Sequence, residues 1–159
     1  MPGRQGQPGF SLIELLVVIT IASVLATLVV LSVGGWQSAD SPERQLDRFA
    51  AQLGQQCEQA LLQSRARGMG LSETGFEAWH LTSQGWQTLA GSARHWPAEV
   101  QPRLMVDGFL VNLAAPPPAP QIVCEPLGEM TAFELDFHGP GSGPRLLGHA
   151  HGRLERQAP

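Results

Sequence analysis

The sequence Gly9-Phe10-Ser11-Leu12-Ile13-Glu14 opens the longest apolar stretch of this chain, which continues to Val33. Between Phe10 and Val33 the sequence contains one charged residue, Glu14. At about 1.5 Å per residue, a helix over this stretch is about 36 Å long, which exceeds the apolar core of a bilayer, about 30 Å thick. Because so apolar a segment cannot lie on the surface of a soluble domain, we expect lipid, other copies of the segment, or both to cover it.

Glu14 is the unusual residue of this stretch. A carboxylate at the centre of a membrane helix costs about 2.5–3.5 kcal/mol on insertion scales, and such acids usually mark function. Glu14 lies about one helical turn after Phe10, so one interpretation is an acid tolerated at the membrane interface. The other is an acid with a fixed cationic partner. Cleavage after Gly9 would create that partner, because the new amino group of Phe10 would lie at the same depth.

This motif resembles the class III signal of type IV pilins and type II secretion pseudopilins, in which a short polar leader ends in glycine before a hydrophobic run. The resemblance implies that a prepilin peptidase cleaves after Gly9 and methylates the amino group of Phe10. It implies that Glu14 aids assembly. An ordinary signal peptide is the alternative, but its apolar region spans only about 7–15 residues. A plain signal anchor is another.

Length and charge limit the remaining classes of protein. The chain has 159 residues, enough for one modest domain besides the apolar stretch. Its net charge is −4 and it has no basic run, so the sequence does not favour a broad nucleic-acid surface. The two cysteines, Cys57 and Cys124, match no metal-site spacing. They form either a disulfide, which a location outside the cytoplasm would permit, or two buried free thiols.

The pattern divides the chain into four parts: a leader at 1–9, a transmembrane and assembly helix at 10–35, an amphipathic second half of that helix at 36–68, and a β domain at 69–159. Ser41 is a candidate N-cap, with Pro42 at the first helical position. Arg67-Gly68 is the expected helix end. The predicted packing face consists of Leu46, Phe49, Leu53, Cys57, Ala60 and Ser64, and Leu61 widens it. The predicted polar side includes Asp47, Arg48, Gln52, Gln55, Gln56 and Gln63.

Strand and turn signals follow the helix. Strands are expected at 76–82, 86–89, 103–113 with a turn at Asp107-Gly108, 122–124, 133–137 and 146–147, with a last short strand near 153–154. A further extended piece is expected to begin at Trp96-Pro97, and 114–120 is expected to be a surface loop. One long helix followed by strands predicts an α+β domain with an antiparallel sheet packed against the helix.

The second half of the chain resembles the H-type minor pseudopilin. The similarity lies in a Trp-containing hairpin, a Trp-Pro pair and the late pattern from Pro126 to Leu135, which reads Pro-x-Gly-Glu-x-x-x-Phe-x-Leu. An Asp-rich calcium loop of the major subunits is missing from the sequence. The resemblance therefore implies a minor subunit that joins tip and shaft of the pseudopilus in protein export. It implies partners among the other minor pseudopilins and the major pseudopilin, and a single-pass position in the bacterial inner membrane with the C-terminal domain in the periplasm.

Catalytic and metal sites are not favoured. His149 and His151 would share a face of a strand, and His138 lies nearby. A zinc site would need a third ligand, for which Glu125 and Glu129 are only guesses, so surface histidines are the better interpretation. His80 and His95 are isolated. No serine elbow, phosphate loop or carboxylate pair suggests an enzyme, and we expect no cofactor, no metal and no nucleic-acid partner.

An alternative function is that of another class of protein, the minor type IV pilins that bind DNA. Some minor type IV pilins bind DNA through a Gly-Arg-x-Arg motif in the C-terminal tail. Here the tail reads Gly152-Arg153-Leu154-Glu155-Arg156, in which an acid interrupts the pattern and displaces the second arginine. The sequence therefore favours a role in secretion.

Overall fold

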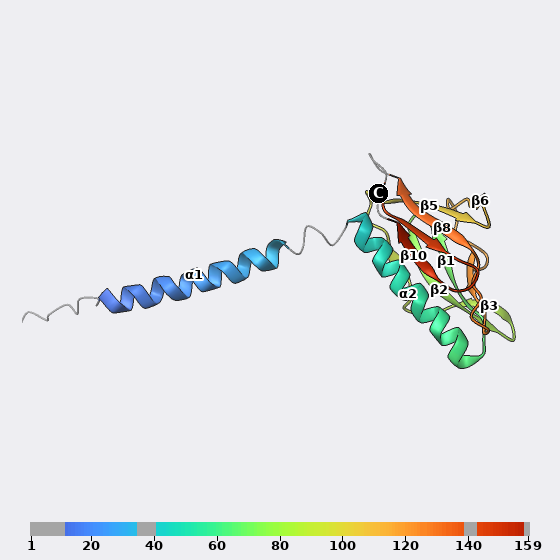
Figure 1. The fold of residues 1–159 in the computed structure, drawn as a ribbon, viewed down its shortest axis with the longest axis horizontal. Helices are drawn as coiled ribbons and strands as arrows, with labels where there is room; N and C mark the ends of the chain where they lie inside the picture. The colour runs from blue at the N-terminus through green and yellow to red at the C-terminus, as the bar shows by residue number, and fades with distance from the viewer. Residues whose placement is uncertain (1–11, 35–40, 139–142, 158–159) are drawn as a thin grey trace, which may run out of the picture. The chain divides into compact units, whose positions relative to one another are not determined.

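The computed structural model describes residues 12–34, 41–138 and 143–157 (Figure 1). The chain divides into two compact units, Met1–Ala39 and Asp40–Pro159, which are described separately. The first unit contains helix α1, Leu12–Gly34, which covers most of the predicted 10–35 helix. The predicted start at Phe10 and the junction at residues 35–36 lie outside the described residues.

The second unit begins with helix α2, Pro42–Gln63. Ser41 is the N-cap, and its hydroxyl accepts a hydrogen bond from the backbone N–H of Arg44 at 3.4 Å. Pro42, which has no backbone N–H, occupies the first turn, where that group has no helical partner to lose. The predicted start of the amphipathic helix is therefore confirmed.

The predicted helix end at Arg67-Gly68 is wrong. The helix ends at Gln63, and Ser64 adopts a left-handed conformation (φ 50°) in which its N–H reaches the carbonyl groups of Ala60 and Leu61. Arg67 and Gly68 instead begin a strand, so the helix ends a few residues before the predicted boundary between 36–68 and 69–159. Gly68 is required for close packing, since a Cβ there would lie 2.6 Å from the carbonyl oxygen of Ile122.

Among the described residues, ten strands follow α2 and form two antiparallel sheets rather than the single sheet that was expected. The first sheet has the order β3-β2-β1-β7, with β4 also paired to β2. Its strands are β1 Arg67–Ser72, β2 Gly75–Thr82, β3 Gly85–Thr88, β4 Arg94–His95 and β7 Ile122–Cys124. The second has the order β10-β9-β8-β5-β6. Its strands are β5 Gln101–Val106, β6 Phe109–Leu110, β8 Phe133–His138, β9 Arg145–Gly148 and β10 Leu154–Gln157.

Most of the predicted strands and turns are present. Asp107 and Gly108 both have positive φ, as the tight hairpin between β5 and β6 requires. The extended piece expected to begin at Trp96-Pro97 is not part of a strand: Trp96 and Pro97 directly follow β4, and the Trp96 side chain is buried in the core. There its indole Nε1 donates to the carbonyl of Ser72 at 3.1 Å, and a turn follows before β5.

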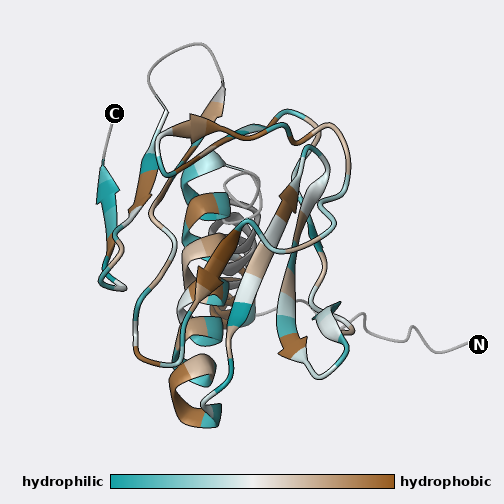
Figure 2. Cartoon of the chain, turned by 90° about the vertical axis from the view of Figure 1, so that its right-hand side faces the viewer, coloured by the Kyte–Doolittle hydropathy of each residue, from teal (hydrophilic) through white to brown (hydrophobic). Residues whose placement is uncertain are grey.

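The core lies between α2 and both sheets, since α2 contacts β1, β2 and β7 of the first sheet and β9 of the second. Figure 2 shows α2 flanked by strands, with hydrophobic residues recurring along its length. The predicted face is correct at its centre, where Leu46, Phe49, Leu53 and Ala60 are all buried. Cys57 is half-buried, but Ser64 is exposed and Leu61 is 49% exposed.

Candidate assembly site

Glu14 lies in the first turn of α1. An acid suits this position, because the unpaired N–H groups at a helix start and the helix dipole favour negative charge. Gly9 and Phe10, the predicted cleavage and methylation residues, lie outside the described residues. The structure therefore places one of the three motif residues, on an otherwise uncharged helix.

Apart from Glu14, Thr20 and Ser23, the described side chains of α1 are apolar, and they are exposed around the helix. They include Leu12, Ile13, Leu15, Leu16, Val17, Val18, Ile19 and Ile21. The hydroxyls of Thr20 and Ser23 donate to the carbonyls of Leu16 and Ile19, each at 2.7 Å, so their polar groups are satisfied within the helix. Such a surface is expected to contact lipid or other protein segments, because exposed apolar patches of this extent mark sites of association.

Within the described part of the chain, no helix combines the length and the hydropathy of a membrane-spanning helix.

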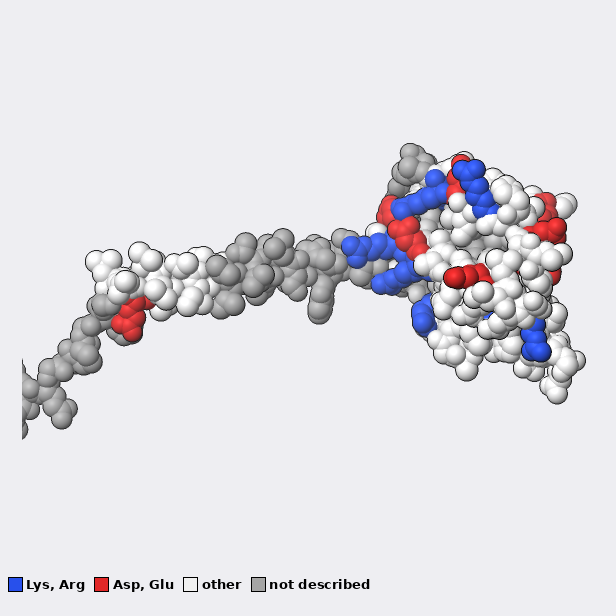
Figure 3. All heavy atoms as spheres, turned by 60° about the horizontal axis from the view of Figure 1, so that its bottom comes forward, with Lys and Arg blue, Asp and Glu red and all other residues white. Residues whose placement is uncertain are grey.

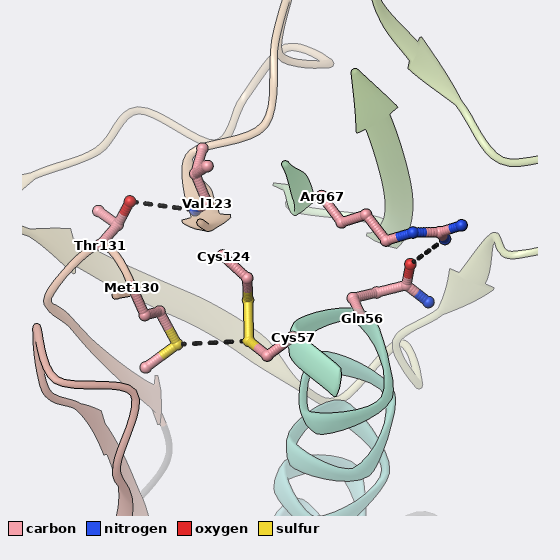
Figure 4. Close-up of a disulfide and its surroundings, with 7 residues drawn as sticks. All are labelled: Gln56, Cys57, Arg67, Val123, Cys124, Met130 and Thr131. Atoms are coloured by element: carbon pink, nitrogen blue, oxygen red, sulfur yellow. Dashed lines mark hydrogen bonds between the residues drawn. A yellow bond between two sulfur atoms is a disulfide. The ribbon is translucent and has the colours of Figure 1, made fainter. Parts of the chain in front are cut away.

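The two cysteines of the sequence are joined, Cys57 from α2 to Cys124 from β7 (Figure 4). Their Cα atoms are 5.0 Å apart, and 67 positions separate them in sequence. The sulfur of Met130 lies 3.9 Å from Sγ of Cys57, on the side away from Arg67 in Figure 4. The disulfide thus fixes the carboxyl half of α2 to the edge strand of the first sheet.

Arg67 is a residue whose environment the sequence did not reveal. Its side chain is only 9% exposed, and its guanidinium donates to the carboxamide oxygens of Gln56 at 2.9 Å and Gln63 at 2.8 Å (Figure 4 draws the first). Gln56 was predicted on the polar side of α2 but is 3% exposed, which is a correction. The two glutamines are seven residues apart, about two helical turns, and this spacing was the signal in the sequence that they share one face of α2.

The histidines do not form a metal centre in the described part of the chain, where no group of three or more His, Cys, Asp or Glu could hold an ion. The ring of His149 stacks on that of His151 with centroids 5.4 Å apart. Nε2 of His149 lies 3.3 Å from the Glu155 carboxylate. His138 ends β8, while His80 and His95 lie on β2 and β4.

The C-terminal tail forms a hairpin strand rather than a free basic segment. Gly152 turns the chain with positive φ, and β10 then pairs with β9. Arg156 forms an ion pair with Asp47 of α2 at 2.6 Å, and Glu155 faces His149. The second arginine of the tail, Arg156, is therefore paired with an acidic residue of its own chain.

Comparison with known proteins begins with the amino-terminal motif, since residues 4–34 match the family model of the prokaryotic N-terminal methylation motif. The fold is similar to that of the minor pseudopilin EPSH of Vibrio cholerae (TM-score 0.64, 21% identity, 77% of this chain and 96% of that chain). It is also similar to Escherichia coli GspH (TM-score 0.60, 21% identity, 76% and 90%). The chain therefore combines the α+β fold of these solved structures with an N-terminal methylation motif.

Sequence similarity defines the family more narrowly. Type II secretion system protein H of Klebsiella michiganensis is 31% identical over 154 residues, which cover 82% of this chain and 84% of that protein. The protein of the same description from Pseudomonas aeruginosa is 27% identical over 150 residues, 87% of each chain. This chain belongs to the family of type II secretion system protein H, the H-type minor pseudopilins.

Proposed function

We propose that this chain is a structural subunit of the type II secretion pseudopilus, where it joins the tip subunits to the shaft of major pseudopilin. The observation that carries the proposal is the combination of two parts in one chain. An exposed apolar helix bears a lone acid by sequence, and a compact α+β domain of the protein H type follows it. The first part suits packing among like helices, and the second suits lateral contacts between subunits.

The proposed location is the bacterial inner membrane, with α1 as a single-pass anchor and the domain from Asp40 in the periplasm. The distribution of apolar residues along the sequence supports this location, because an apolar run of this length needs lipid or helical partners. The disulfide between Cys57 and Cys124 agrees with it, because disulfides persist in the oxidising periplasm and are rare in the cytoplasm.

The proposed processing is cleavage after Gly9 by a prepilin peptidase and methylation of Phe10. The intact mass of the protein extracted from membranes should then show loss of residues 1–9 and the gain of one methyl group. A full-length chain in a host with active prepilin peptidase, or a mature chain that starts near Gly35, would contradict this processing.

The test of the whole proposal is deletion and complementation in the source bacterium. Deletion should leave exported proteins folded in the periplasm, and expression of this chain should restore their release into the medium. Normal export in the deletion strain, with the other secretion genes intact, would overturn the proposal.

The alternative, a minor pilin that binds DNA, has weaker support. The net charge is −4, and in the tail Arg156 is paired with Asp47. DNA retention that weakens steeply as salt is raised would favour the alternative, because phosphate contacts release counterions.

A further inference from the structure

A groove of about 610 Å³ lies between α2 and the segment that leads from β3 to β4. Its volume falls within the range of about 300–1,000 Å³ that is typical of binding sites. The groove belongs entirely to the unit Asp40–Pro159 and lies apart from the amino-terminal motif. None of the functions discussed above uses it.

The titratable side chains of the groove are all basic. Arg48 comes from α2, Arg94 and His95 come from β4, and no aspartate or glutamate lines the groove. Glu77, the neighbour of the lining residue Phe76 on β2, lines an adjoining hollow, which Arg94 and His95 also line. The chain as a whole has a net charge of −4, so a groove with cations alone departs from the average of the molecule. Figure 3 shows arginines on the part of the domain where α2 begins, with acidic residues beside them.

Arg48 is the cation best placed to bind a ligand. It is exposed, and it has no hydrogen-bond or ion-pair partner within the described ranges 12–34, 41–138 and 143–157. Arg94, in contrast, is held in place, since its guanidinium donates to the carbonyls of Gly91 at 3.0 Å and Ala93 at 2.8 Å. One cation is therefore free to adapt, and the other is fixed on the opposite wall.

The remaining lining suits a polypeptide backbone. Several glutamines of α2 line the groove, among them Gln52, Gln55 and Gln59, and each carboxamide offers both donors and acceptors. The wall is preformed: Nε2 of Gln52 donates to the carbonyl of Ser92 at 3.0 Å, and the Ser92 hydroxyl accepts from the N–H of Ala78 at 3.0 Å. Leu89, which is half-buried, adds apolar surface, whereas Phe76 is almost fully buried.

We propose that this groove binds an extended acidic segment of a partner polypeptide. Arg48 and Arg94 would each take a carboxylate, since guanidinium groups bind carboxylates in a bidentate manner. The glutamines would pair with the segment's backbone, and one of its side chains would rest on the half-buried Leu89. A nucleic acid fits less well, because the one aromatic residue of the groove, Phe76, is buried and offers no stacking surface. The inference does not depend on which filament the chain joins.

The experiment uses the full chain, purified in an uncharged detergent, and a labelled peptide of alternating glutamate and alanine. The control probe has lysine in place of each glutamate. Binding of the acidic peptide should exceed that of the basic peptide and should weaken as salt rises to several times the physiological level. Arg48→Gln should weaken it about three- to fivefold, as expected for an exposed ion pair. The double variant Arg48→Gln with Arg94→Gln should weaken it about tenfold.

Arg65→Gln is the matched control variant. It removes the same charge from an exposed arginine just beyond α2 that does not line the groove, and it should leave binding unchanged. Charge reversal with Arg48→Glu should shift preference toward the lysine peptide, which a loss of folding would not do. Equal binding of both peptides, or equal loss in the Arg48 and Arg65 variants, would overturn the proposal. So would tighter binding of a single-stranded oligonucleotide that Arg48→Gln abolishes. A failure here with intact protein export would leave the proposed function standing.

Discussion

Phe49 of α2 occupies the centre of the core, with none of its surface exposed. Its ring makes edge-to-face contacts with Phe76 at 5.2 Å and Phe133 at 6.2 Å, one from each sheet. It also contacts Trp96 at 6.3 Å. One side chain therefore ties the helix to both sheets at once.

Phe49→Ala should lower the free energy of unfolding by about 3–5 kcal/mol, because it removes a buried ring and leaves a cavity. The measurement is urea unfolding of the isolated unit Asp40–Pro159. Phe109→Ala is the matched control: this ring is 78% exposed, and its loss should change stability by less than about 0.5 kcal/mol. Equal effects of the two variants would mean that α2 does not pack as described.

Gln56→Leu should destabilise the same unit by about 1–3 kcal/mol, because it leaves the buried guanidinium of Arg67 without one of its two acceptors. Gln55→Leu makes the same change on an exposed neighbour and should have little effect. Unfolding in urea distinguishes the two. If both variants behave alike, the glutamine contacts of Arg67 contribute nothing to stability.

At the scale of the element, α2 is held to the sheets by three kinds of attachment. Apolar packing surrounds Phe49, the disulfide joins Cys57 to β7, and the ion pair of Asp47 joins the helix to Arg156 of β10. Exposed ion pairs contribute only about 0–1 kcal/mol, so packing and the disulfide carry most of the attachment.

Reduction of the disulfide should lower the free energy of unfolding by about 4 kcal/mol in the chain-entropy model, given the 67-residue separation. Urea unfolding of the unit Asp40–Pro159 with and without reductant measures the effect. A variant with both Cys57→Ala and Cys124→Ala should match the reduced protein and should not respond to reductant. Identical curves for the oxidised and reduced wild type would show that the bond adds no stability.

At the scale of the whole molecule, Glu14 should act in assembly rather than in anchoring. In a filament its carboxylate would pair with the Phe10 ammonium of a neighbouring subunit, and such a pair forms at only one axial stagger. Glu14→Leu should therefore still enter the membrane and still be cleaved after Gly9, but it should fail to co-purify with other pseudopilins. Glu14→Gln keeps the shape without the charge and should behave like the leucine variant.

Co-purification after cross-linking, together with intact mass, separates the outcomes of this experiment. Normal incorporation of both variants would make Glu14 an acid that is merely tolerated near the interface. Loss of cleavage in either variant would assign it to recognition by the peptidase instead.

The sequence by itself determined the features that depend on neighbouring residues. Spacing along the chain is enough to identify the apolar run, the Ser41-Pro42 helix start, the Asp107-Gly108 turn and the alternation at Phe133, Leu135 and Phe137, because each follows from local geometry. The amino-terminal motif that contains Glu14 belongs to the same group, because it too is a pattern of residues at fixed spacing.

Only the tertiary structure decided the rest. Ser64 ends α2 because the chain must turn into β1, which pairs on both sides with β2 and β7, and none of these pairings is visible in a local window. Burial of Arg67 against Gln56 depends on where that strand passes the helix, so Gln56 was assigned to the wrong side of α2. The basic groove arises in the same way, since Arg48 and Arg94 are 46 positions apart in sequence and meet only when α2 packs against the first sheet.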